Sequence, residues 1–369
     1  MERQKSRDRM IDIIKGIMII PIVIYHLVYR TQDGAFDIAI RELTYLALSV
    51  FILFSGYFYH KNESMIRHNH KLLFPVIITL LVLLALFGPY YMIFHHYTLQ
   101  MWFWDSVMTF LRPELTVLLA PGYTGGQLFN NLSPVWFIWT LVFSRLLFSV
   151  VMRFVKESRI KLICSMAVLL VIGCLLYVHV PPLPWSLTLA PLCACIMMVG
   201  VILRKYRVLT KLSKVNLPLS FLISVAAGFI HYLIFINFGN ESLYRSYLGD
   251  KGYLSAALYV VQLLFGGFAV LTIARAIDRI KHLGNVFAWI GKNTLIILLF
   301  HALIGGLAMD AMQTYNKPGE YWYLDPLPVE VVIKSVISFV ISWAGCVGLC
   351  LLNGRLKYLD IRRLHKPLV

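Results

Sequence analysis

The sequence is poor in charge. Asp, Glu, Lys and Arg make up 14% of its 369 residues, and only 18 residues are acidic. Soluble globular domains carry about 25% charged and about 45–50% apolar residues, whereas this chain is 59% apolar with a mean hydropathy of +0.74. One soluble core cannot bury this excess, because cores stop growing beyond roughly 250–300 residues. The composition excludes a soluble enzyme, a disordered chain and a small disulfide scaffold, and it predicts an integral protein of the lipid bilayer.

Metal-binding patterns are also lacking. The six cysteines lie in apolar stretches and show neither CxxC nor Cys/His ligand spacing. The pairs His68-x-His70 and His95-His96 have no convergent carboxylates or cysteines that would complete a zinc site. We therefore expect reduced cysteines that fill apolar space, no metal site and no tightly bound cofactor.

Nucleic acid is not an expected partner, although 34 Lys and Arg give a formal net charge of +16. The basic residues form no stripe interleaved with aromatic residues, and no recognition motif is present. They lie instead in short clusters between long apolar runs, where basic residues orient membrane helices.

Ten apolar segments are long enough to cross a bilayer core, for which a helix needs roughly 20 residues. No internal repeat or low-complexity tract divides them, so we expect one all-α polytopic membrane bundle over residues 1–369, with tails at 1–10 and 354–369. A further short helix is expected at about 100–112, outside the spans. The expected spans are 11–29, 41–59, 72–94, 134–152, 162–180, 186–203, 217–238, 253–274, 287–309 and 329–353.

The loops between these segments differ sharply in charge. Those that share a side with the N-terminus hold 24 Lys and Arg, and the opposite set holds 6. Cytoplasmic loops carry the excess of basic residues. The asymmetry predicts that both termini are cytoplasmic and that the protein is a multi-pass protein of the plasma (cytoplasmic) membrane.

The first span carries three ionisable residues, Asp12, Lys15 and His26. Ionisable side chains within a span are costly and often functional. The eleven steps from Lys15 to His26 are about three helical turns, so the two share one face roughly 16 Å apart along the axis. Asp12 lies on that face and can pair with Lys15 at i,i+3. An imidazole is the usual general base near neutral pH, but a packing His bonded to a backbone carbonyl has the same sequence pattern.

This stripe resembles the start of the acyltransferase-3 family of membrane acyltransferases, which opens with a basic residue, ten intervening positions and a His. Most members have Arg at the basic position. The form with Lys, written here Asp12-x-x-Lys15-Gly16, is similar to the fucose-4-O-acetylase-like branch.

Further family motifs follow in order along the chain. Phe54-Ser-Gly-Tyr57 resembles the family's Phe-x-x-Ser-Gly-Tyr/Phe stretch, and Ser133-Pro-Val-Trp-Phe137 resembles its Pro-Leu-Trp-Phe span entry. Gly291-Lys-Asn-Thr294, followed by His301, is similar to the family's Gly-Lys-Asn-Ser…His. The family's Arg-rich run before the third span is weaker here, in Arg67-His-Asn-His-Lys71-Leu-Leu-Phe-Pro75.

The resemblance implies transfer of an acyl group from cytoplasmic acyl-CoA, usually acetyl-CoA, to a hydroxyl of a cell-surface glycan or lipid-linked sugar. His26 would be the general base, with Lys15 and Asp12 on its face. CoA is an anionic co-substrate, so the expected donor-binding cations are Arg9, Lys15, Arg67 and Lys71.

Other polar residues are candidates for the acceptor side or for oxyanion stabilisation. Ser55, Trp136 and Asn293 could donate hydrogen bonds to an oxyanion. Arg145 lies within a span and needs a partner or a polar cavity, so ligand binding and a structural ion pair with Glu42 or Asp12 both fit. His301 fits either the acceptor side or simple packing.

Two other functions remain open from the sequence: a transporter or flippase for a polyisoprenoid-linked sugar or small anion, or a non-catalytic subunit of a polysaccharide export complex. No internal repeat or matched pair of broken spans favours transport. An enzyme needs the His26 stripe, whereas a flippase should tolerate His26→Ala. The sequence does not indicate an oligomeric state.

Overall fold

The computed structural model describes residues 9–28, 35–59, 65–94, 96–111, 132, 136–156, 158–180, 183–209, 211, 215–238, 252–312 and 329–358. These residues are helical apart from short connections, and no strand occurs among them. The elements are α1 (Arg9–Leu27), α2 (Ala35–Tyr57), α3 (Met65–Phe94), α4 (Leu99–Leu111), α7 (Trp136–Val155), α8 (Arg159–His179), the 3-10 helix η2 (Pro184–Leu189), α9 (Ala190–Lys205), α11 (Leu217–Phe238), α12 (Gly252–Arg279), α13 (Lys281–Lys292), α14 (Thr294–Ala311) and α15 (Val329–Tyr358).

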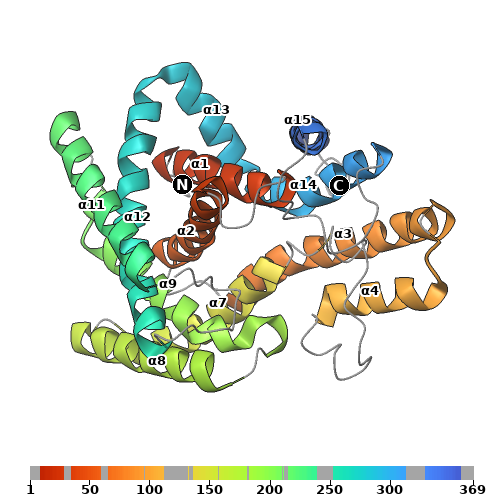
Figure 1. The fold of residues 1–369 in the computed structure, drawn as a ribbon. Coiled ribbons are helices and arrows are strands. Elements are labelled where there is room, and N and C mark those ends of the chain that lie inside the picture. Colours follow the sequence, from red (N-terminus) through yellow and green to blue (C-terminus); the bar gives the residue numbers. More distant parts are fainter. Residues whose placement is uncertain are drawn as a thin grey trace, which may run out of the picture.

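Helices α1 and α2 form the centre of the bundle (Figure 1). Helix α1 packs against α2, α12, α13, α14 and α15, and α2 packs against α9. Helices α11 and α12 lie on one side of this centre, and α3 and α4 lie on the other. The functional stripe predicted on α1 is therefore enclosed by protein, where an ionisable residue can be held away from lipid.

Among the described residues, eight helices are long and apolar enough to cross a membrane: α1, α2, α3, α7, α8, α9 with the end of η2, α14 and α15. This confirms a multi-pass all-helical protein. The remaining two expected spans, 217–238 and 253–274, coincide with the helices α11 and α12. The exact number of ten spans and the side of the membrane on which the termini lie stay predictions.

The short helix expected at about 100–112 is present as α4, where two tryptophans tie it to the bundle. The indole Nε1 of Trp102 donates to the carbonyl oxygen of Leu84 on α3 at 3.1 Å. The Nε1 of Trp185 on η2 donates to the carbonyl oxygen of Phe110 at 2.8 Å.

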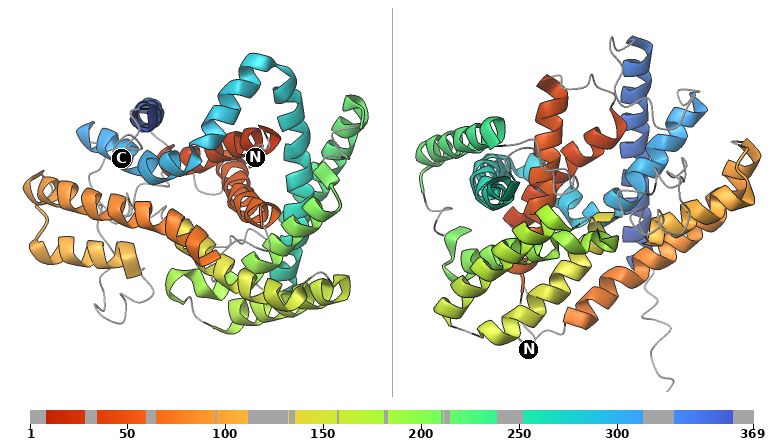
Figure 2. Two further views of the ribbon diagram at one scale, coloured as in Figure 1. Left: turned by 180° about the vertical axis from the view of Figure 1, so that it is seen from behind. Right: turned by 60° about the horizontal axis from the view of Figure 1, so that its bottom comes forward.

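The span expected at 287–309 is divided at Asn293 into α13 and α14. Asn293 has φ −108° and ψ 10°, its backbone N–H bonds to the carbonyl of Ile290, and its side-chain Nδ2 donates to the carbonyl of Trp289 at 2.8 Å. The membrane helix therefore starts at Thr294. Helix α14 lies beside α1 and α15 and packs against both of them (Figure 2).

The glycines of the predicted motifs are sites of close backbone approach between helices. A Cβ at Gly291 would lie 1.7 Å from the backbone oxygen of Asp12, and one at Gly16 would lie 2.1 Å from that of Phe287, so α1 and α13 touch backbone to backbone. A Cβ at Gly56 would lie 1.8 Å from the backbone oxygen of Met197, which gives α2 and α9 the same kind of contact. Small residues allow such approaches in membrane helices. The glycines therefore set the positions of their neighbours Lys15 and Ser55.

Candidate active site

A cavity of about 530 Å³ opens between α1, α2, α3, α7 and α14. Its volume lies in the range of small-molecule sites, roughly 300–1,000 Å³. Most of its lining is apolar, and four polar side chains reach it. The lining residues are Lys15, Ile19, Ile22, Phe51, Phe54, Ser55, Phe58, Leu72, Phe137, Ile138, Leu141, Arg145, Thr294, Leu295 and Leu298.

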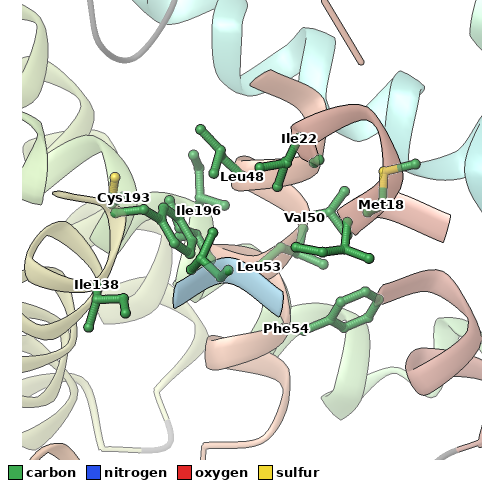
Figure 3. Close-up of a cluster of buried hydrophobic side chains, with 14 of the residues drawn as sticks. Met18, Ile22, Leu48, Val50, Leu53, Phe54, Ile138, Cys193 and Ile196 are labelled. Carbon is green, nitrogen blue, oxygen red and sulfur yellow. The ribbon is translucent and has the colours of Figure 1, made fainter. Parts of the chain in front are cut away.

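The apolar wall of this cavity is the surface of a buried cluster (Figure 3). Ile22, Phe54 and Ile138 belong both to the cavity lining and to the cluster. Cys193 is buried in the same cluster, as expected of a cysteine that fills apolar space. Closely packed interiors hold side chains in fixed rotamers, so the wall presents a defined surface to a ligand.

Lys15 lies at the cavity on α1, and its ammonium nitrogen is 5.4 Å from the centroid of the Phe58 ring. The attraction between a cation and an aromatic face contributes about 0.5–1 kcal/mol at an exposed site and about 2 kcal/mol where water is excluded. Phe58 is not among the residues singled out in the sequence, yet it directly follows the Phe54-Ser-Gly-Tyr57 motif. The sequence-predicted pairing of Lys15 with Asp12 stays a prediction, and the Asp12 side chain is buried.

Arg145 reaches the same cavity from α7, and its Nη2 donates to the Ser55 hydroxyl oxygen on α2 at 3.0 Å. The structure thus brings together three predicted residues from separate spans: Lys15, Ser55 and Arg145. Glu42, one of the two acidic partners suggested for Arg145 by the sequence, has an oxygen 3.3 Å from the Nε2 of His231 on α11. Two cationic side chains in a mainly apolar cavity favour a ligand that is anionic at one point and apolar elsewhere.

The fourth polar side chain at the cavity is that of Thr294, which the sequence analysis did not single out. Its hydroxyl donates to the carbonyl of Gly291 at 3.3 Å, and it lines the cavity at the start of α14. The adjacent Asn293, which was predicted as a donor, is engaged with Trp289 and is not a lining residue. Thr294 occupies the last position of the Gly291-Lys-Asn-Thr294 motif, which is the signal that could have identified it.

The lining residues of α1 and α14 form two stripes that end at histidines. On α1, Lys15, Ile19 and Ile22 line the cavity, and His26 lies one turn further on the same face. On α14, Thr294 and Leu298 line it, and His301 lies about one turn further. The two imidazole rings meet, with their centroids 5.3 Å apart and their planes at 59°. Two rows of lining residues therefore lead towards a pair of histidines that lies beyond the cavity lining.

The remaining predicted residues lie elsewhere. Arg9 forms an ion pair through its Nε with Oδ1 of Asp278 at 2.8 Å, and it is not a lining residue. Trp136 begins α7 and contacts the ring of Phe137, a lining residue, without lining the cavity itself. The side chains of Arg67 and Lys71 lie outside what the structure describes; their backbone forms the start of α3, and the next residue, Leu72, lines the cavity.

Among the described residues no group of three or more His, Cys, Asp or Glu side chains gathers as a metal site would require. The cavity lining itself offers two cations and two hydroxyls, and the imidazoles of His26 and His301 lie beyond it.

A family model for the acyltransferase-3 type of acyltransferase domain matches residues 8–347, nearly the whole chain. The match includes every lining residue of the cavity and both histidines. A comparison with curated proteins gives no significant match.

Proposed function

This chain belongs to the acyltransferase-3 family, and we propose that it is a membrane O-acyltransferase that moves an acyl group from acyl-CoA to a hydroxyl of a glycan or lipid-linked sugar. The observation that supports this most is that Lys15, Ile19 and Ile22 line one wall of the cavity and that His26, one turn further on the same face, meets His301. Acetyl-CoA is the proposed donor. The fucose-4-O-acetylase-like branch, the plasma membrane and cytoplasmic termini are part of the same proposal.

The proposed donor site is the cavity with its cytoplasmic mouth. Lys15 provides a cation at the proposed mouth. Arg67 and Lys71 lie in the first two turns of α3, and Lys71 directly precedes the lining residue Leu72. Phosphates bound by these cations would leave the long, weakly polar arm of CoA to run along the apolar lining. The roughly 16 Å between Lys15 and His26 matches an extended arm that brings the thioester to the imidazole.

The proposed chemical step is general base catalysis. His26 takes the proton from the acceptor hydroxyl while the oxygen of that hydroxyl attacks the thioester carbonyl carbon. The new carbon–oxygen bond forms, the carbon–sulfur bond breaks, and the CoA thiolate leaves and takes up the proton from His26. Ser55 and Arg145, which are hydrogen-bonded at the cavity, are the proposed donors to the oxyanion that develops on the carbonyl oxygen.

Lys15→Ala is expected to weaken donor binding because it removes the cation from the mouth of the cavity. A hydrogen bond to a charged group contributes about 1.5–3 kcal/mol, so the KM for acetyl-CoA should rise about 10- to 100-fold. Initial rates at varied acetyl-CoA measure this. Lys161→Ala is the matched control, since Lys161 is exposed on α8, which does not line the cavity. An unchanged KM in Lys15→Ala would remove Lys15 from the donor site.

Arg145→Leu is expected to reduce kcat at least 10-fold at normal membrane abundance, because the oxyanion would lose its charged donor. The apolar replacement suits a membrane span, so loss of folding does not explain such a result. Arg153→Leu on the exposed face of the same helix is the control. A kcat equal to that of the wild type would leave Arg145 with a packing role only.

The proposal as a whole is tested by incubating purified protein with acetyl-CoA and a glycan extract from cell envelopes. Chromatography then measures the CoA that is released. Release that depends on the glycan extract is the expected result. In proteoliposomes, movement of a polyisoprenoid-linked sugar without any CoA release would favour the flippase alternative and contradict the proposal.

A further inference from the structure

His301 is the most enclosed ionisable side chain near the cavity. It is 0% exposed on α14, and its Nδ1 lies 2.8 Å from the carbonyl oxygen of Ile297 and 3.1 Å from that of Leu298. A carbonyl oxygen only accepts hydrogen bonds, so Nδ1 carries the proton in the neutral ring. Nε2 is then a lone pair that can only accept.

None of the residues that the structure describes gives a hydrogen bond to this Nε2, which is fully buried. Buried polar atoms in folded proteins are nearly always paired, and one that is not calls for a functional explanation. The ring whose centroid lies 5.3 Å away is that of His26. An imidazole with one N–H is a suitable donor for an acceptor-only nitrogen.

The surrounding packing holds the two rings together. A Cβ at Gly305, one turn beyond His301, would lie 2.2 Å from Cδ2 of Leu27, the residue after His26, so α1 and α14 are in close contact at this level. The hydroxyl of Ser342 on α15 donates to the backbone oxygen of His301 at 2.7 Å. Contacts from two neighbouring helices, α1 and α15, thus hold this part of α14 in place.

We propose that His301 is a positioning residue whose Nε2 accepts the N–H of His26 and so leaves the other ring nitrogen of His26 as the base that faces the substrate hydroxyl. This inference rests on the proposed function. The hydrogen bond selects one tautomer of His26, orients its ring, and stabilises the imidazolium that forms when His26 takes the proton. His301 itself exchanges no proton in the reaction.

Two replacements separate this role from packing. His301→Phe keeps a flat ring of similar size and removes the acceptor, whereas His301→Gln keeps an acceptor oxygen on a side chain of different shape. We expect kcat for acetyl transfer to fall about 10- to 100-fold in His301→Phe, with the KM for acetyl-CoA unchanged. His301→Gln should retain clearly more of the wild-type kcat than His301→Phe.

The measurement is steady-state kinetics of both variants beside the wild type and His26→Ala, each at equal membrane abundance. A His301→Phe protein that is as active as His301→Gln, or more active, would overturn the positioning role, because packing would then explain the residue. Equal inactivity of both folded variants would overturn it as well. A wild type without transfer, or an active His26→Ala, would instead contradict the proposed function, so the two failures are distinguishable.

Discussion

Replacing His26 by Ala is expected to abolish acyl transfer while the protein remains in the membrane at normal abundance. General base catalysis typically contributes about 10²–10⁴-fold to a rate, and an alcohol is a weak nucleophile without it. The cavity and Lys15 are unaffected, so binding of acetyl-CoA should persist. The expected pattern is therefore loss of kcat with donor affinity retained, measured by transfer rates and by equilibrium binding of labelled acetyl-CoA.

His179→Ala is the matched control for this prediction. His179 is the last residue of α8, is exposed, and belongs to a helix that does not line the cavity. Its replacement should leave kcat and KM at wild-type values. Loss of transfer in both variants would mean that histidine removal harms the protein in general, and it would argue against a specific base at His26.

Replacing Gly291 by Ala is expected to disrupt the packing of α1 on α13. The added Cβ would lie 1.7 Å from the backbone oxygen of Asp12, which cannot swing away as a flexible side chain would. The helices must separate. Overpacking a well-packed site costs about 1–3 kcal/mol and occasionally more, so we expect a lower melting temperature, less protein in the membrane and a displaced Lys15.

Gly348→Ala provides the comparison, because outside the local backbone of α15 no atom of the described residues lies within 4 Å of the Cβ that it adds. Alanine favours a helix over glycine by about 1 kcal/mol, so this variant should be as stable as the wild type or slightly more stable. The stability of both variants is measured by heating detergent-solubilised protein and then quantifying the folded fraction by size-exclusion chromatography. A Gly291→Ala protein as heat-resistant as Gly348→Ala would contradict the close approach of α1 and α13.

Much of the fold follows from apolar runs, because a span needs only length and hydropathy to be recognised. Eight of the expected spans correspond to helices that can cross a membrane. The break at Asn293 was not predicted, although the short stretch Gly291-Lys-Asn-Thr294 interrupts the apolar run there. The break depends on local bonds to Trp289 and Ile290 that the sequence pattern does not show.

The site was predictable to the extent that it lies on one helix. Lys15 and His26 share a face by the helical repeat alone, and that face does follow the cavity as far as Ile22. Contacts between spans that are distant in the sequence were harder to predict. Arg145 was recognised as needing a partner, but only the packing of α2 on α7 shows that Ser55 is one of them. Likewise, no pattern in the sequence indicates that His301 meets His26.

Arg9 has a contact that the charge pattern did not indicate. It was grouped with the donor-binding cations because it precedes the first span, and in the structure its Nε pairs with Asp278 at 2.8 Å. Its part in donor binding stays a prediction.

The most direct measurement is the transfer of radiolabelled acetyl groups from acetyl-CoA to a cell-envelope glycan fraction, compared between purified wild type and His26→Ala protein. The labelled glycan is then treated with mild alkali. Alkali cleaves an ester on a hydroxyl and leaves an amide intact. The account predicts label in the glycan with the wild type only, and its release by alkali. Label that resists alkali, or label that enters the glycan equally with His26→Ala, would contradict it.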